Sequence, residues 1–122
     1  MSDPDPRHVF GREAEDRAVT ALIEQGYRIL ERNLRTRLGE VDIVAMDGDT
    51  LVFVEVRARR DGSAVHPAAT VTRRKQRQVV RVAMLYCQKH GVRNTMIRFD
   101  VVAVLGENSG IEIIRNAFEA GR

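Results

Sequence analysis

An Asp-Gly turn between two apolar, β-branched runs is the feature of this chain that most restricts its fold. The runs cover residues 39–46 and 50–57, and Asp47-Gly48 lies between them. Asp-Gly is a strong local signal for a β-hairpin, because both residues tolerate the left-handed backbone of a tight turn. The second run is apolar on both faces up to Val54, as in a strand buried at the centre of a sheet. The chain is therefore predicted to build a sheet around this hairpin.

Charged side chains interrupt both strands of the predicted hairpin. Asp42 lies on the first strand, and Glu55 and Arg57 share one face of the second. A two-residue loop at Asp-Gly would put Asp42 opposite Phe53 with Glu55 as a diagonal neighbour, whereas a four-residue loop would put Asp42 directly opposite Glu55. A three-residue loop would move Asp42 to the other face. With an even loop the two carboxylates could share a divalent cation; the alternative is an edge hairpin with charges on its solvent-exposed face.

The periodicity of the whole chain predicts one α/β domain in the order helix, three strands, helix, two strands. Helical spacing of apolar residues extends over residues 11–25 and 70–90, and a glycine follows each stretch. Strand patterns cover residues 26–33, 39–46, 50–57, 96–105 and 111–115. Because 122 residues suit a single core, we expect a disordered lead over residues 1–7 and one domain over residues 8–122.

Nothing in the sequence suggests a membrane or secreted protein. No apolar stretch is long enough to cross a bilayer, and the N-terminus lacks the apolar core of a signal peptide. The single cysteine, Cys87, cannot form an intramolecular disulfide and falls in an apolar helical run, which favours a buried thiol. We therefore expect a cytoplasmic protein without membrane contact.

Three further charged residues are predicted to lie inside the fold. Glu15 falls on the inward face of the first helix and could reach the carboxylate face of the hairpin; the alternative partner is an arginine such as Arg12. Lys75 continues the buried stripe of the second helix, four residues before Val79, and either reaches the same carboxylates or extends past the sheet edge into water. Asp100 interrupts an apolar strand and is interpreted either as support for the site or as the exposed end of that strand.

A basic surface is expected on the second helix. Residues 62–99 hold eight Lys or Arg and no Asp or Glu, and Arg73, Arg77 and Arg81 recur every four residues. A block of one sign on a helix favours a polyanionic partner, although it could also be a solvated face. The residues expected to contact nucleic acid are Arg59, Arg60, Arg73, Arg74, Lys75, Arg77 and Arg81.

Six short segments, in order along nearly the whole chain, carry a resemblance to a known family. They are residues 11–15, 26–27 with 32–33, 39–45, 52–57, 98–102 and 116–118. Together they resemble the YraN family of bacterial proteins, which is similar to the archaeal Holliday-junction resolvases. The resemblance implies a restriction-endonuclease-like, or PD-(D/E)XK, fold: a mixed sheet flanked by helices in the order αβββαββ.

The resemblance also implies a metal-dependent nuclease acting on DNA phosphodiesters, with structured or branched DNA as a candidate substrate. Asp42 and Glu55 match the metal-binding pair, which would hold Mg²⁺ or Mn²⁺, and Glu15 matches the helix carboxylate. Val41 replaces the motif proline. Arg57 replaces the motif lysine, and because guanidinium stays protonated it cannot take a proton from water.

Two hypotheses about the function of the site follow. In the first, Asp42, Glu55, Arg57 and Lys75 form the catalytic set of an endonuclease, which would need a homodimer to cut a junction symmetrically. In the second, the chain is a catalytically inactive, nuclease-like module that binds nucleic acid in DNA processing. A third hypothesis is a protein-binding adaptor, which the absence of Asp and Glu from residues 62–99 disfavours. The sequence does not distinguish DNA from RNA or branched from linear substrates.

Overall fold

The order of elements in the computed structural model is the predicted αβββαββ order. The structure describes residues 6–59, 63–106 and 110–120, with side chains described from residue 11 onward. Its elements are α1 (Pro6–Glu24), β1 (Arg28–Thr36), β2 (Gly39–Asp47), β3 (Thr50–Ala58), η1 (Pro67–Thr70), α2 (Arg73–Lys89), β4 (Ile97–Val104) and β5 (Ile111–Phe118). The predicted α/β class, a mixed sheet flanked by helices, is therefore confirmed.

The ends of the elements differ from the prediction in a few places. Helix α1 begins at Pro6 rather than residue 11, so the last two residues of the expected lead are helical, and residues 1–5 lie outside the described residues. The short 3-10 helix η1 lies in a stretch predicted as loop, and the His66 side chain caps it by accepting a hydrogen bond from the Ala68 amide. Helix α2 has the expected ends, with Thr72 as its N-cap and His90 as its C-cap.

The sheet has five strands in the order β1-β2-β3-β4-β5. Strands β3 and β4 are parallel, and every other neighbouring pair is antiparallel. The parallel pair needs a crossover connection, which η1 and α2 supply. Strand β3 is the central strand, which explains why its sequence is apolar on both faces.

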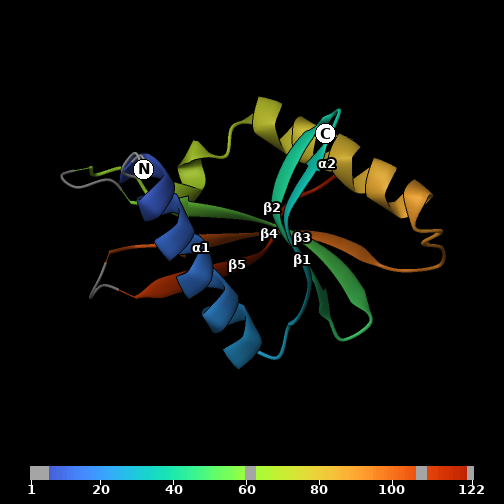
Figure 1. Cartoon of the computed structure of the whole chain (residues 1–122), viewed down its shortest axis with the longest axis horizontal. Helices are drawn as coiled ribbons and strands as arrows, with labels where there is room; N and C mark the ends of the chain where they lie inside the picture. The colour runs from blue at the N-terminus through green and yellow to red at the C-terminus, as the bar shows by residue number, and fades with distance from the viewer. Residues whose placement is uncertain (1–5, 60–62, 107–109, 121–122) are drawn as a thin grey trace, which may run out of the picture.

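Each face of the sheet packs against one long helix. The residues of β3 alternate between the two cores, so that Phe53 faces α2 and Val54 faces α1. In β2, Ile43 faces α1, whereas Val41 and Val44 both face α2, so the alternation is interrupted around Asp42. Figure 1 shows α1 and α2 flanking the strands. The helix residues buried in these cores are Ala18 and Leu22 from α1 and Val79, Val82 and Ala83 from α2. Among the described residues, no helix is both long and apolar enough to cross a membrane.

The register of the hairpin puts Asp42 across from Glu55. Asp47 pairs with Thr50, so the loop consists of two residues and starts at Gly48, whose φ is 59°. The ladder continues to the pair Ile43–Val54, and the next position opposes Asp42 to Glu55. This is the register expected from a four-residue loop. The structure reaches it with a two-residue loop at residues 48–49, one residue later than the predicted Asp47-Gly48 turn. Glu55 follows Phe53 on the α2 face of the sheet, and Asp42 lies next to it at the end of the ladder.

Candidate metal and nucleic-acid site

Asp42 lies where β2 separates from β3. The last recorded pair of the ladder is Ile43–Val54, and the amide of Val56 then donates a hydrogen bond of 2.8 Å to Asp42 Oδ2. The carboxylate thus takes an amide that the ladder no longer pairs, and an unpaired amide would be unfavourable. This contact holds the Asp42 side chain against the centre of the sheet.

Glu55 is a buried carboxylate with one oxygen unsatisfied. Its exposed fraction is 1%, because it follows Phe53 on the face covered by α2. Glu55 Oε2 lies 3.1 Å from Nη1 of Arg57, but Oε1 is buried and has no hydrogen-bond partner within the described part of the chain. Buried polar atoms are usually paired, so this oxygen is an exception within the described structure.

The surroundings of Glu55 favour its neutral form. Burial raises the pKa of Glu55 to about 7, and the negative charge of Asp42 contributes to this rise, whereas the positive charges of Lys75 and Arg57 act in the opposite direction. The two carboxyl groups are close enough to share a hydrogen bond when one of them holds a proton. Burial and a neighbouring negative charge are the two usual reasons for a carboxyl pKa this high.

Arg57 is the counter-ion that the structure itself supplies. Its Nη1 lies 3.1 Å from Glu55 Oε2 and 3.8 Å from Asp42 Oδ2, and it donates a hydrogen bond of 3.0 Å to the Val56 carbonyl. The three charged residues therefore share one face, as the even loop predicts. Arg57 occupies one oxygen of Glu55 and leaves Oε1 available.

Lys75 approaches the same face from α2. Its ammonium charge lowers the pKa of Glu55, and its Nζ donates a hydrogen bond of 2.8 Å to Gln78 Oε1. The backbone amide of Lys75 donates to the Thr72 hydroxyl at the start of the helix. That Lys75 reaches the carboxylates stays a prediction.

Glu15 is buried, but its recorded partners belong to β1. Its Oε1 accepts hydrogen bonds from Arg32 Nε at 3.0 Å and from Asn33 Nδ2 at 3.1 Å, so its arginine partner is Arg32. Asn33 adopts a left-handed conformation, with φ 54°. Helix α1 packs on the face opposite Glu55. No group of three or more His, Cys, Asp or Glu able to hold a metal ion occurs among the residues that the structure describes, and Glu15 as a metal ligand stays a prediction.

The predicted nucleic-acid residues of α2 lie at the surface. Arg73, Arg77 and Arg81 are exposed, and Arg74 is exposed next to them. Arg59 lies directly after the end of β3, and its Nε is buried without a hydrogen-bond partner in the described structure. Arg60 lies outside the described residues.

Asp100 is the centre of a buried network that the sequence did not reveal. It is fully buried, so its interpretation as an exposed strand end was wrong. Asp100 pairs across the ladder with Val54 and lies on the α1 face, away from Glu55. Its oxygens accept hydrogen bonds from Tyr27 Oη at 2.7 Å, from Arg98 Nε at 2.8 Å and from the Asn116 amide at 3.0 Å. Its contacts therefore fasten β4 to β5 and to the end of α1.

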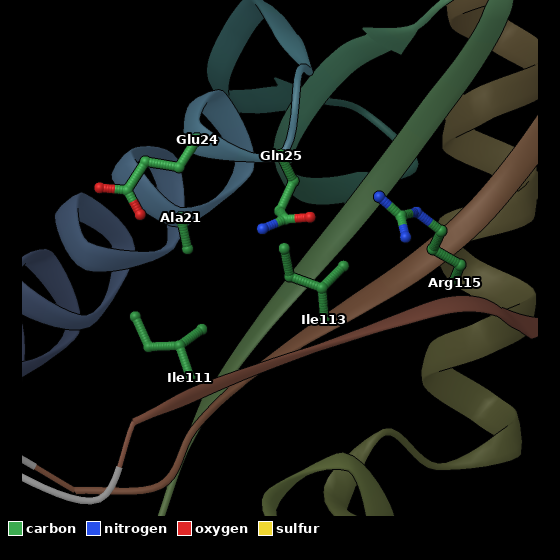
Figure 2. Close-up of a pocket in the computed structure, with 6 residues that line it drawn as sticks. All are labelled: Ala21, Glu24, Gln25, Ile111, Ile113 and Arg115. Carbon is green, nitrogen blue, oxygen red and sulfur yellow. The ribbon is translucent and has the colours of Figure 1, made fainter.

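A pocket of about 400 Å³ lies between α1 and β5 on the same side of the sheet as this network. Figure 2 shows the side chains that line it, which include Glu24, Ile113 and the guanidinium of Arg115. Arg115 Nε donates to Tyr27 Oη at 3.1 Å, so the wall of the pocket is continuous with the Asp100 network. None of the predicted site residues lines this pocket, so it is separate from the carboxylates.

Most of the chain is similar in sequence to known proteins. Residues 14–104 match the family model described as "Uncharacterised protein family UPF0102". The chain is 46% identical to a UPF0102 protein of Desulfosudis oleivorans over 93% of both chains. It is 48% identical to one of Desulforapulum autotrophicum, over 90% of this chain and 93% of the relative, and 52% identical to one of Anaeromyxobacter dehalogenans, over 84% and 76%. The names of these relatives give only the family.

Proposed function

Because the chain belongs to the UPF0102 family, whose YraN proteins it was predicted to resemble, we propose that it is a metal-dependent nuclease that hydrolyses DNA phosphodiester bonds. The observation that carries this proposal is the buried, unpaired Oε1 of Glu55 beside the Asp42 carboxylate. The family names state no activity, so the proposal rests on the chemistry of the site and on the resemblance stated above.

Asp42 and Glu55 fit a divalent cation. Mg²⁺ and Mn²⁺ prefer carboxylate oxygens, and the unpaired oxygen of Glu55 lacks the partner that such an ion would provide. A bound ion would polarise the phosphate and lower the pKa of a water molecule. Asp42 and Glu55 would hold the ion, and the Val56 amide keeps the Asp42 carboxylate in position.

The two cations beside the carboxylates suit a phosphate group. Arg57, already directed at both carboxylates, would bind an oxygen of the scissile phosphate and neutralise its developing charge. It stays protonated and cannot act as a base. Lys75 would supply the ammonium that the superfamily motif places at the position of Arg57. The positive charge of the exposed arginines on α2 would hold the DNA backbone nearby.

Metal binding should depend on pH in the range where Glu55 titrates. The proton on Glu55 competes with the ion, so raising the pH from 6 to 8 across a pKa of about 7 should tighten the apparent Mn²⁺ affinity about tenfold. Titration calorimetry at several pH values would measure this change. Glu55→Gln should bind Mn²⁺ weakly and without this pH dependence, and a wild-type affinity that is constant from pH 6 to pH 8 would contradict the assignment.

Removing the basic line of α2 should weaken DNA binding. Replacing Arg73, Arg77 and Arg81 by Ala removes three exposed charges, and at roughly 0.9 per phosphate contact the salt slope of duplex binding should fall by up to about 2.7. Fluorescence anisotropy between low and high salt would measure both affinity and slope. The matched control replaces three exposed arginines elsewhere, Arg28, Arg35 and Arg37, and changes the net charge equally. Equal salt slopes for the two triple variants would mean that Arg73, Arg77 and Arg81 form only a solvated face and do not bind DNA.

A second function, a nuclease-like module that binds nucleic acid without cutting it, is favoured by one observation. Arg57 replaces the motif lysine and forms an ion pair with Glu55. The test is a cleavage assay with Mg²⁺ and with Mn²⁺ on linear, flapped and four-way DNA. Metal-dependent products that disappear with chelator support the nuclease. Binding of the same DNA without products under either metal would support the binding module.

A further inference from the structure

Gln78 links Lys75 to the strand that carries Asp42. Both residues lie on α2, three positions apart, and Lys75 Nζ donates a 2.8 Å hydrogen bond to Gln78 Oε1. Both side chains are half-buried, unlike the exposed Arg73, Arg74 and Arg77 around them. An ammonium on a four-carbon chain has many rotamers, and this contact selects among them.

Gly39 of β2 provides the space in which the Gln78 side chain lies. A Cβ built on Gly39 would come within 2.5 Å of Gln78 Cδ and 2.7 Å of its Nε2, which is closer than non-bonded atoms allow. The backbone of Gly39 also has a φ of 140°, a value that favours glycine. Strand β2 therefore supplies Asp42 and, three residues earlier, the surface on which Gln78 rests.

We propose that Gln78 is a positioning residue, which holds the Lys75 ammonium toward Glu55 from its place over Gly39. The inference rests on the proposed nuclease function for its effect on cleavage, but the positioning itself does not depend on activity. Lys75 Nζ is bonded to the Gln78 amide, and that amide lies against Gly39 of β2, so the ammonium is held near the sheet rather than extended into solvent. The charge effect of Lys75 on Glu55 agrees with this direction.

The chain allows a direct test, because Lys75 and Lys89 are its only lysines. Lys89 is exposed in the last turn of α2 and serves as the internal reference. The protein is treated with a limiting amount of an amine-reactive acetylating reagent, and mass spectrometry measures the rate at each lysine. Lys75 should be acetylated more slowly than Lys89. Gln78→Met keeps the length of the side chain but removes the acceptor, and should raise the ratio of Lys75 to Lys89 rates roughly fivefold, since a hydrogen bond to a charged group is of moderate strength. Gln78→Glu retains an acceptor and should keep the ratio at or below that of wild type.

Cleavage provides the second measurement. Gln78→Met should lower kcat roughly tenfold, while KM for DNA stays near that of wild type, as expected when charge stabilisation is lost without loss of DNA contacts. Gln78→Glu should restore most of kcat, and Gln78→Met should cause no further loss in a Lys75→Ala background. An acetylation ratio that is unchanged by Gln78→Met would overturn the positioning role. Absence of cleavage by the wild type would instead count against the nuclease proposal, while the acetylation ratio still decides the role of Gln78.

Discussion

Replacing Asp42 by Asn is expected to abolish metal-dependent DNA cleavage. The carboxamide of the variant would still offer an oxygen to the Val56 amide, so the end of the β2–β3 ladder should keep its geometry. The substitution removes one of the two charges that hold the cation, and losing a group that stabilises the transition state typically lowers the rate on the order of a hundredfold or more. Initial rates with Mn²⁺, with DNA affinity measured in parallel, would establish the loss.

The control for this variant is Asp49→Asn, an equal change of charge at the exposed tip of the same hairpin. It should cleave at the wild-type rate. A second readout follows from the electrostatics, because the charge of Asp42 is one of the causes that raise the pKa of Glu55. In Asp42→Asn that pKa should fall, which carbon-detected NMR of the Glu55 carboxyl can follow. Cleavage by Asp42→Asn at the rate of the control would end the two-carboxylate assignment.

Replacing Asp100 by Ala is expected to destabilise the fold more than any change at the candidate site. Asp100 is fully buried and accepts hydrogen bonds from Tyr27, Arg98 and the amide of Asn116. Its removal leaves the half-buried guanidinium of Arg98 without the carboxylate that binds both its Nε and its Nη2. Removing one partner of a buried ion pair typically costs about 3–5 kcal/mol, and because Asp47 still contacts Arg98 in this variant, a loss near the lower end of that range is expected.

Urea denaturation would measure the free energy of unfolding of Asp100→Ala. The matched control is Glu112→Ala, which removes a carboxylate whose side chain is 50% exposed in its pair with His66, where a loss below about 1 kcal/mol is expected. A stability change for Asp100→Ala as small as that of the control would show that the network contributes little. Asp47 also contacts Arg98, at 2.8 Å, so Asp47→Ala should give an intermediate loss.

The hairpin and the ends of α2 could be predicted because their signals are local. The Asp-Gly turn, the alternation of β3 and the Thr72 cap each involve residues a few positions apart. A common face for Asp42, Glu55 and Arg57 was predicted only for an even loop, and the pairing of Asp47 with Thr50 in the structure decided the loop length. The exact register of β2 against β3 could not be predicted, because turns of two and four residues are both compatible with the sequence.

The partners of buried charges depended on the tertiary structure. Periodicity showed that Glu15 points inward, but its contacts with Arg32 and Asn33 join residues from two different elements. The burial of Asp100 was missed, because its partners Tyr27 and Asn116 lie far from it in the sequence or beyond a bulge in the β4–β5 ladder. Each helix covers one face of the sheet, so residues that look equivalent in a periodic pattern can lie on opposite sides of the molecule.

By itself, the sequence determined the order of the elements and the basic line on α2, and it put the two hairpin carboxylates and Arg57 on one face only for an even loop. Turn formation and side-chain periodicity depend on residues only a few positions apart, so the local sequence is enough to predict them. Only the tertiary structure decided that Glu55 is buried with an unpaired oxygen, that Gln78 over Gly39 holds Lys75, and that Asp100 belongs to a network on the opposite face. The physical reason is that desolvation and charge pairing depend on which distant segments meet, and this is set by how the helices and strands pack.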